Sequence, residues 1–491
     1  MYYNFHDEEE VKEIKKDNTK NTNNKTKYLI FCISFILVII LIILLFGYFM
    51  KKRNNVKVDY PTNLPEDTPY TERIFDTNYM HEINIIIDKK DWKDLTENPL
   101  NKTKYKVDVL IDGIKFNNVS FNTKGNSSLN NVANGPKNGP ASNRYSFKIN
   151  FGKYEKDQTY YGLDKLNLNN IYGDASYLND YIAYNTFRAA GIPAPLCSFA
   201  YIKINGESFG LYTIVEEVED SFLKRNNLTG NLYKPEQSDG QDRGASLTYT
   251  DDNIESYIDI FNNVQTKSSD EDYKRLIDII KKLNNLEDLD NILDTDTIIR
   301  YFAAHNFLLS YDSYTGKSIH NYFLLESNNK ISILPWDYNL SFGRYNMHED
   351  ITTIINYGID SPLYKINNES RPLWNWILSK QEYIDKYHEV MNELLSNYYE
   401  SGLYEKDIDN IYKLIKPYIE KDYSAFYKPE EVDRAVTTLK EFIKNRIQSI
   451  RLQLDNKLST ITEDQDKELK VNSSNINLED LGLVADDKKR K

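Results

Sequence analysis

Two acids and two amides lie where short apolar runs begin and end. Asp337 and Asn339 follow the strand-like run ISILPW, and Asn321 opens an earlier run, NYFLLE, just after a segment that carries Asp312. Carboxylate and amide oxygens are ligands that Mg²⁺ prefers, with water and phosphate oxygens completing its shell. We therefore predict that Asp337, Asn321 and Asn339 hold a metal ion. Asp312 is predicted to accept the proton of an attacking hydroxyl group.

A purely structural interpretation of the same residues stays open. Asp312 and Asp337 could be turn residues, and Asn321 could pair at the edge of a strand. Both acids, however, lie among aromatic residues around one predicted hairpin. A carboxylate that is partly removed from water needs a cationic partner, and this favours the metal site.

A Gly- and Asn-rich segment, FNTKGNSSLNNVANGPKNGP, follows a predicted strand. Backbone amides and hydroxyls at Gly125, Asn126, Ser127 and Ser128 could cradle phosphate groups. The alternative is a surface loop that binds nothing.

A lysine in the next predicted strand could serve the same ligand. In SFKINF, Phe147 and Ile149 share one face, so Lys148 points to the other face. In a cleft Lys148 would pair with phosphates, and elsewhere it would face solvent. Glu216 and Glu217 end a later strand, where they could contact a ligand or simply precede a helix.

The elements that must position these residues fall into two groups. Asp112-Gly113 and Asn205-Gly206 predict two tight hairpins in a strand-rich first part. A helix is predicted from Asp174 to Ala190, and the pattern after about residue 252 is mostly helical. We predict an α+β fold with a small β-rich lobe, a helical lobe and a ligand cleft between them.

The ends of the chain differ from this domain in composition. Residues 28–50 are uncharged and apolar, which predicts a transmembrane helix, and basic residues flanking it favour a cytoplasmic N-terminus with the large domain outside. The full division is a polar segment (1–27), the membrane helix (28–50), a linker (51–75), the main domain (76–455) and a charged, disordered tail (456–491).

The charge balance narrows the classes of partner. The formal net charge of the chain is −13. A broad basic surface is therefore not expected, and we predict no nucleic-acid partner. Cys32 and Cys197 lie in unrelated segments, so no disulfide is predicted.

Several motifs together resemble the CotH family of spore-coat, kinase-like proteins. The resemblance runs in order over roughly residues 80–455, and its motifs are KGNSS, YSFKINF, LDKLNLNN, AAGIPAP, INGESFGLY, VEEVEDSFLKR, GNLYKPE, HNYFL and PWDYNLSFG. It implies an atypical protein-kinase-like fold that binds ATP with Mg²⁺ and phosphorylates proteins, sometimes itself.

The resemblance also implies roles for particular residues. Asp312 matches the family's catalytic Asp and Asp337 its metal-binding Asp, while Lys148 resembles the strand lysine that contacts phosphates. Asn321 resembles the amide that helps to hold metal. Family members often carry a second acid at the position of Asn339, and an amide there keeps an oxygen donor but weakens metal binding.

Two functions from different classes follow. The first is a membrane-anchored protein kinase that transfers the γ-phosphate of ATP to Ser or Thr of coat or surface proteins. The second is a coat or surface protein that uses the same fold as a binding module without catalysis. A third, carbohydrate binding through Trp92, Trp374 and Trp376, lacks a motif, because Trp at helical spacing is more often part of a core. No role is predicted for Lys234.

Overall fold

The computed structural model describes residues 29–43, 56–61, 64–135 and 142–483. Two compact units, residues 1–57 and 58–491, divide the chain. Residues 29–43 of the first unit form a helix with exposed side chains. The strands of the second unit are β1 (His81–Ile86), β2 (Tyr105–Ile111), β3 (Ile114–Lys124), β4 (Ser146–Asn150), β5 (Lys165–Asn169), β6 (Cys197–Ile204), β7 (Glu207–Glu216), β8 (Asn231–Tyr233), β9 (Tyr322–Ser327) and β10 (Lys330–Pro335).

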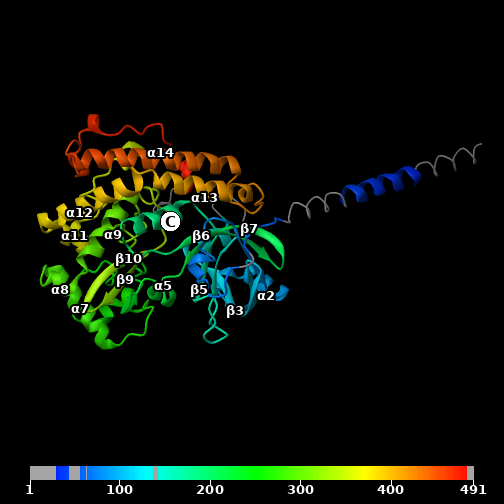
Figure 1. Cartoon of the computed structure of the whole chain (residues 1–491), viewed down its shortest axis with the longest axis horizontal. Helices are drawn as coiled ribbons and strands as arrows, with labels where there is room; N and C mark the ends of the chain where they lie inside the picture. Colours follow the sequence, from blue (N-terminus) through cyan, green and yellow to red (C-terminus); the bar gives the residue numbers. More distant parts are fainter. Residues whose placement is uncertain (1–28, 44–55, 62–63, 136–141, 484–491) are drawn as a thin grey trace, which may run out of the picture. The chain divides into compact units, whose positions relative to one another are not determined.

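Helices fill most of the remaining chain of the second unit. They are α2 (Lys89–Glu97), α3 (Ser127–Asn134), α4 (Asn179–Ala189), α5 (Asp220–Arg225), α6 (Ile258–Phe261), α7 (Asp270–Asn285), α8 (Leu289–Ile292), α9 (Thr295–Leu308), α10 (Ile351–Ile355), α11 (Pro372–Leu378), α12 (Gln381–Leu394), α13 (Leu403–Ile419) and α14 (Pro429–Leu454). Figure 1 shows α13 and α14 running side by side, and the two helices are in contact.

Seven strands close on themselves in the order β1-β2-β3-β4-β5-β7-β6. The two predicted hairpins are confirmed: β2 and β3 pair across the Asp112-Gly113 turn, and β6 and β7 pair across Asn205-Gly206. Every neighbouring pair is antiparallel except β1 with β6, which run parallel and close the sheet. The closure places one face of every strand inside.

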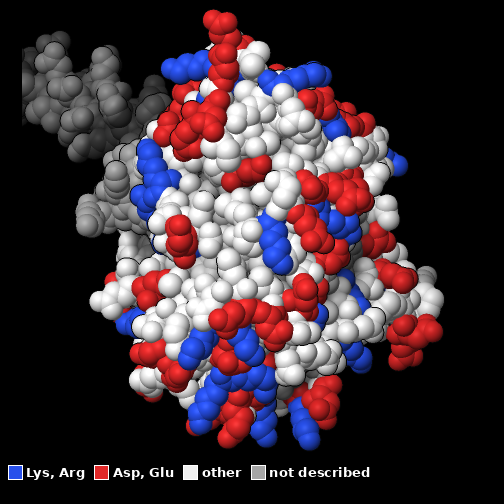
Figure 2. All heavy atoms as spheres, turned by 90° about the vertical axis from the view of Figure 1, so that its left-hand side faces the viewer, with Lys and Arg blue, Asp and Glu red and all other residues white. Residues whose placement is uncertain are grey.

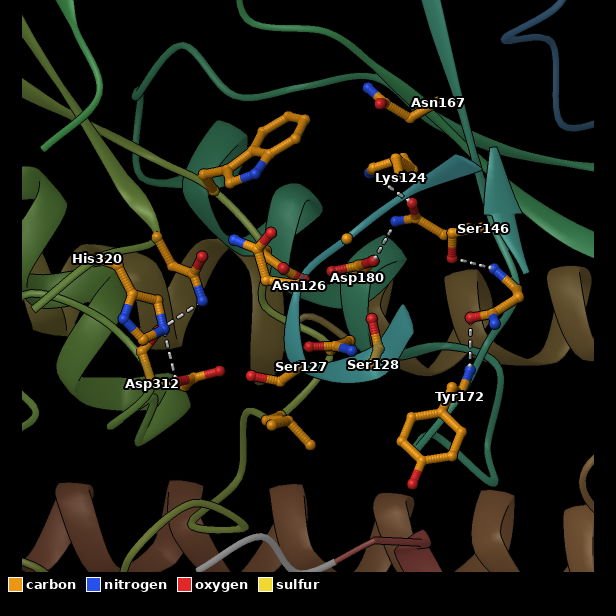
Figure 3. Close-up of a pocket in the computed structure, with 18 of the residues that line it drawn as sticks. Lys124, Asn126, Ser127, Ser128, Ser146, Asn167, Tyr172, Asp180, Asp312 and His320 are labelled. Atoms are coloured by element: carbon orange, nitrogen blue, oxygen red, sulfur yellow. Dashed lines mark hydrogen bonds and ion pairs between the residues drawn. The ribbon is translucent and has the colours of Figure 1, made fainter. Parts of the chain in front are cut away.

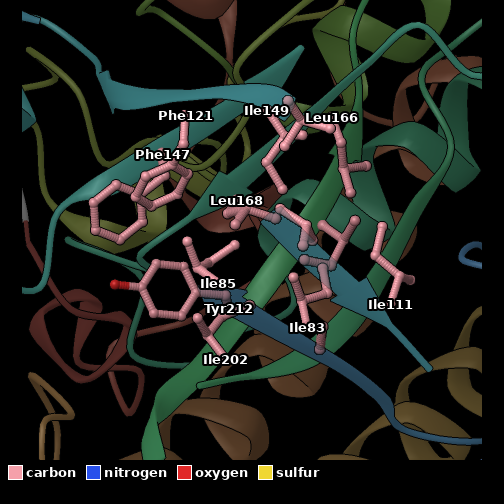
Figure 4. Packing of buried hydrophobic residues seen from close by; sticks show 14 of the residues in the cluster. Ile83, Ile85, Ile111, Phe121, Phe147, Ile149, Leu166, Leu168, Ile202 and Tyr212 are labelled. Carbon is pink, nitrogen blue, oxygen red and sulfur yellow. The ribbon is translucent and has the colours of Figure 1, made fainter. Parts of the chain in front are cut away.

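The inside of the closed sheet is an apolar core. Figure 4 shows side chains from several strands meeting there, among them Ile83, Phe121, Phe147, Leu168 and Tyr212. Side chains alternate between the two faces of a strand. The residues between these core positions therefore point outward from the sheet, and Lys148 is one of them, as its sequence neighbours predicted.

A second sheet and its helices follow the closed sheet in the sequence. Its three strands have the order β10-β9-β8, and α9 packs on β10 and α12. Arg144, which precedes β4, forms a fully buried ion pair with Asp422 between α13 and α14, with 2.7 Å between Nη1 and Oδ2.

Trp374 and Trp376 are fully buried, so neither offers a ring to a sugar. On the face shown in Figure 2, acidic and basic side chains are interspersed.

The structure corrects the predicted fold class and location. The unit is a mixed α/β domain built on a closed seven-stranded sheet, where we predicted a two-lobed, kinase-like arrangement behind a membrane helix. Among the described residues, no helix combines the length and the apolar character that crossing a bilayer requires. The predicted transmembrane helix and the single-pass location are therefore not supported. Residue 28 and residues 44–50 of the predicted helix lie outside the described residues, as does the predicted polar segment 1–27.

Part of the segment predicted as a tail packs against the domain. Leu458, Ile476 and Leu481 are buried, and the 3₁₀ helix η8 (Leu478–Leu481) contacts α14. Apolar side chains spaced along a polar segment were enough to dock it. Residues 484–491 of the predicted tail lie outside the described residues.

Candidate functional site

A cavity of about 620 Å³ lies against the outer face of the closed sheet. Its walls come from β3, β4, β5 and β7, from the start of α3, and from the segments that follow β8, α9 and β10. Most of the predicted site residues line it, namely Gly125, Asn126, Ser127, Ser128, Lys148, Glu217, Asp312, Asn321, Asp337 and Asn339. Figure 3 shows Asp312 and His320 at one side, Lys124 and Asn167 at the other, and the start of α3 between them.

Lys148 is held at the cavity by two acids that follow β7. Its Nζ lies 2.8 Å from Oε2 of Glu217 and 3.5 Å from Oε1 of Glu219. Asn167, the cross-strand neighbour of Lys148, donates to the same Glu217 carboxylate at 2.8 Å. Burial alone would raise the pKa of Glu217, but Lys148, Lys124 and Lys234 outweigh it and lower this pKa to about 2. Glu217 is therefore a buried anion surrounded by cations.

Two further lysines, without a predicted role, complete this side of the cavity. Lys124 ends β3 and donates from Nζ to Oδ1 of Asn169 at 2.9 Å, and burial lowers its pKa. Lys234 follows β8, and its Nζ lies 5.4 Å from the ring centroid of Trp336. We call Lys124, Lys148, Lys234 and Glu217 the lysine side of the cavity. Three lysines therefore lie around one buried carboxylate, and they offer cations to an anionic ligand.

The predicted phosphate loop is the junction between β3 and α3. Gly125 has φ of +98°, a conformation that side chains other than glycine rarely adopt, and a Cβ there would lie 2.9 Å from Oγ of Ser128. The turn brings Ser127 and Ser128 into the first turn of α3, where backbone N–H groups lack intrahelical acceptors. Asn126 precedes the helix, accepts from Lys102 at 2.7 Å and donates to Glu236 at 3.0 Å. This arrangement suits an anion better than an irregular loop would.

The opposite wall carries two buried acids, Asp180 and Asp337, that interact with each other. Asp337 follows β10 in a left-handed conformation (φ 55°), and its N–H donates to the hydroxyl of Tyr184 at 3.1 Å. Burial raises the pKa of Asp337, and Lys124 opposes this only in part. Burial, followed by the charge of Asp337, also raises the pKa of Asp180 at the start of α4. We call Asp180 and Asp337 the acid side.

Hydrogen bonds fix the two acids relative to each other. Asp180 accepts the N–H of Tyr338 at 3.0 Å through Oδ1. Its other oxygen accepts from the side chain of Asn169 at 3.3 Å. Asn179 donates to the carbonyl oxygen of Asn339 at 2.9 Å. The start of α4 therefore holds the segment that carries Asp337 and Asn339.

Asp312 lies across the cavity in a pair with histidine. Its Oδ1 is 2.8 Å from Nε2 of His320, and its carbonyl oxygen accepts from the side chain of Asn321 at 2.9 Å. Burial would lower the pKa of His320, but Asp312 outweighs it and the pKa is raised. Asn321 also has a left-handed backbone (φ 56°). Two non-glycine residues with positive φ at one site mark a constrained backbone, which is typical of functional sites.

Glu216 is the one predicted site residue that lies outside the cavity. Its Oε2 forms an ion pair with Arg225 at 2.7 Å and accepts from the backbone of Leu196 at 3.0 Å. Its Oε1 accepts from the hydroxyl of Tyr70 at 2.5 Å. Because successive residues of a strand point to opposite sides, Glu216 joins the sheet to α5 while Glu217 reaches the ligand side.

The cavity contains oxygen atoms of the kind that bind Mg²⁺. The described residues contain no group of three or more His, Cys, Asp and Glu side chains that could hold a metal. The acid side nevertheless offers carboxylate oxygens whose pKa is raised by burial and, for Asp180, by the charge of Asp337, and Asn339 and Asn321 line the same cavity. A hard cation that takes its remaining ligands from water and phosphate fits such a set.

Several lining residues had no predicted role, Lys124, His320 and Asp180 among them, and the sequence signals for these three differed. Lys124 stands beside the glycine of KGNSS, and His320 opens HNYFL, so both lay inside quoted motifs. Asp180 lies in an apparently ordinary amphipathic helix, where an acid in the first turn is the expected choice. Only the packing of α4 against the segment after β10 brings it to the site.

Comparisons with known proteins agree on one family. The family described as "CotH kinase protein" matches residues 121–450 of the chain. The inner spore coat protein H of Bacillus subtilis (strain 168) is 24% identical over 319 residues, which is 62% of this chain and 82% of that protein. The family match, residues 121–450, contains every cavity-lining residue named above except Lys102.

Proposed function

The chain belongs to the CotH family, and we propose that it binds Mg·ATP in this cavity and transfers the γ-phosphoryl group to Ser or Thr hydroxyls of proteins. Because the relative in Bacillus subtilis is an inner spore coat protein, we further propose spore-coat or surface proteins, including the chain itself, as acceptors.

One observation carries the proposal. A cluster of cations and a cluster of under-neutralised acids line the same cavity, together with a third acid, Asp312, that is separate from both. A ligand that is itself anionic and binds through a divalent cation satisfies both clusters at once. Phosphoryl transfer depends mainly on positioning and on neutralising charge, and this cavity offers residues for both.

Each group would have a distinct part in the reaction. Lys124, Lys148 and Lys234 would bind phosphate oxygens as point charges. Asp337, Asp180 and Asn339, with Asn321, would hold Mg²⁺, which when bound neutralises phosphate charge. Asp312 would orient the acceptor hydroxyl and take its proton as the new P–O bond forms. The bond between the γ-phosphorus and its bridging oxygen breaks, and ADP leaves.

His320 would assist Asp312 by position. The 2.8 Å contact between Nε2 and Oδ1 fixes one carboxylate oxygen. The second oxygen is then the one that can accept from a hydroxyl group. The role of His320 is therefore to orient the carboxylate.

A radiolabel assay tests the proposal. The full chain is incubated with γ-labelled ATP, Mg²⁺ and either no acceptor or a coat-protein extract. Label on the chain or on an acceptor, lost in Asp312→Ala and retained in Lys203→Ala, is the expected result. Lys203 is a suitable control because it lies on β6, outside the cavity, and pairs with Glu82 at 2.6 Å.

The alternative function is a non-catalytic coat module that uses the same cavity to hold a ligand. Asn339 favours it, because the resemblance implies an acid at this position and an amide there weakens metal binding. Binding of Mg·ATP without transfer of label to any protein would support this second function and reject the first.

A further inference from the structure

The last described stretch of the chain, residues 471–483, returns from the far side of α14 to the rim of the cavity. We call it the strap. It lies beyond residues 121–450, the part that matches the family. Val471 donates its N–H to Oδ1 of Asn356 at 2.9 Å, and Ser473 donates to Oγ1 of Thr352 at 3.1 Å. Its start is therefore fixed to the end of α10.

The other end of the strap pairs with the segment before α4. Leu483 donates its N–H to the carbonyl oxygen of Gly173 at 3.1 Å, and Ala175 donates to that of Leu481 at 3.0 Å. Leu481 is fully buried, and Leu483 lines the cavity. Gly482, between them, has φ of +108° and no room for a side chain, since a Cβ would lie 2.7 Å from the Gly173 oxygen.

A buried arginine ties this pairing to the acid side. Arg344 is fully buried, and its Nη1 donates to the carbonyl oxygens of Gly173 at 2.5 Å and Leu481 at 2.9 Å. Its Nη2 donates to the carbonyl oxygen of Asn339, a predicted metal-binding residue. One guanidinium group therefore joins the strap, the segment before α4 and the segment after β10.

The segment before α4 carries the connection onward to Asp180. The backbone of Asp174 pairs with that of Gly482 in the strap. The carboxylate of Asp174 accepts from the N–H groups of Ser176 and Asn179, both at 3.0 Å. These bonds organise the start of α4, where Asp180 accepts the N–H of Tyr338. The strap is thus linked to Tyr338, the neighbour of Asp337, through three pairings: Gly482 with Asp174, Asp174 with Asn179, and Asp180 with Tyr338.

We propose that docking of the strap organises the acid side, so that strap docking and binding of Mg·ATP favour each other. The inference rests on the proposed function, because the ligand it names is the proposed one. Strap residues make no contact that would bind phosphate or metal. Their effect is to position the backbone of residues 173–180 and 337–339. Coupling of this kind is reciprocal, so ligand must also tighten the strap.

The test uses two glycine variants of the full chain. Gly482→Ala places a methyl group against the Gly173 oxygen and should release the strap. Gly402→Ala is the matched control, since Gly402 also has a positive φ (+78°) but nothing lies within 4 Å of a Cβ there. Hydrogen exchange of peptides covering 471–483 and 173–179 reports docking, and calorimetry reports the affinity for Mg·ATP.

We expect Gly482→Ala to lose protection in both peptides and to bind Mg·ATP about tenfold more weakly, whereas Gly402→Ala keeps both properties. In the wild-type chain, saturating Mg·ATP should slow exchange in the strap. The proposal is overturned if Gly482→Ala frees the strap yet binds Mg·ATP as tightly as Gly402→Ala. It is equally overturned if ligand leaves exchange in the wild-type strap unchanged.

Two further outcomes are distinguishable from these. If Gly482→Ala does not fold, the exchange measurement on the wild-type chain with and without Mg·ATP decides the matter alone. If the wild-type chain does not bind Mg·ATP at all, the proposed function fails first, and the coupling is rejected with it.

Discussion

Glu217 and Asp337 are acids that line one cavity, yet the surroundings move their pKa values in opposite directions. Three lysines lower the pKa of Glu217 to about 2 in spite of burial. Burial raises the pKa of Asp337, and nearby Lys124 offsets it only in part. The lysines thus outweigh the burial of Glu217, whereas on the acid side the nearby cations do not outweigh burial. The difference indicates which side of the cavity would gain more from a bound cation.

The largest effect is expected from a substitution on the acid side. Asp337→Ala should weaken Mg·ATP binding by at least about 100-fold, because a metal ligand contributes more than the residues that support it. Transfer of label should disappear with it. Calorimetry checks the affinity, and Asp290→Ala, an exposed acid of α8, is the control. Unchanged affinity in Asp337→Ala would show that the acid side holds no metal.

Removing Asp312 should separate chemistry from binding. Asp312→Ala should lower the rate of transfer by about 10²–10⁴-fold, the usual contribution of a general base. The affinity for Mg·ATP should stay close to that of the wild type, since Asp312 belongs to neither side. A melting curve must accompany the assay, because loss of the His320 pair could destabilise the segment. A large loss of affinity in a folded variant would argue against the role of a base.

On the lysine side, removing the buried carboxylate should cost stability. Glu217 is 5% exposed, and its pKa lies about 2.5 units below the ordinary value. Glu217→Gln should therefore lower the free energy of unfolding by about 3 kcal/mol, at about 1.4 kcal/mol per unit. Because the folded pKa is depressed, the stabilisation is present above about pH 4.5 and is lost as pH falls through about 2. Urea titrations of both proteins at pH 7 and pH 3 measure it, and equal stability at pH 7 would contradict the pairing.

A lysine on the ligand side should affect binding more than folding. Lys148→Ala should weaken Mg·ATP binding by about tenfold, as expected for one charge-assisted contact. Lys203→Ala, another lysine of the closed sheet that is paired with an acid, should leave binding unchanged. If both variants bind alike, Lys148 serves only its glutamate partners.

The smallest expected effect is a gain of stability, opposite in sign to the loss expected for Glu217→Gln. Asp180→Asn should raise the free energy of unfolding at pH 7–8 by about 1 kcal/mol, because it removes a poorly neutralised charge. Because the folded pKa of Asp180 is raised, wild-type stability falls as pH rises from the ordinary carboxyl value to that raised pKa, and the variant should lose this decline. It should also bind Mg²⁺ more weakly. A variant less stable than wild type at pH 8 would show that the Asp180 carboxylate is already balanced.

Local signals in the sequence predicted the local structure. Asp112-Gly113 and Asn205-Gly206 fixed two hairpins, because few residues accept the backbone of so tight a turn. The alternation around Lys148 placed its side chain on the outer face. Most of the site residues that the motifs predicted line one cavity, although the roles of these residues stay predictions.

The pairing of strands that are far apart in the sequence could not be predicted from such local signals. Closure of the sheet depends on β1 and β6 running parallel, with Ile83 opposite Ile202, and no periodicity encodes the partner of a strand. The position of Asp180 depends on how α4 packs. The apolar run at 28–50 illustrates the opposite error, since composition alone predicted a span that the described helices do not provide.

The most direct test of the account is calorimetry of ATP with the full chain, first in Mg²⁺ and then in excess EDTA. If the acid side is a cation site facing a phosphate site, ATP binds tightly with Mg²⁺ and its affinity collapses with the chelator. Lowering the pH in the presence of Mg²⁺ should weaken binding, because protons then compete for the raised-pKa acids. Equal affinity with and without Mg²⁺ would contradict the central claim, since the lysine side alone would then be binding the nucleotide.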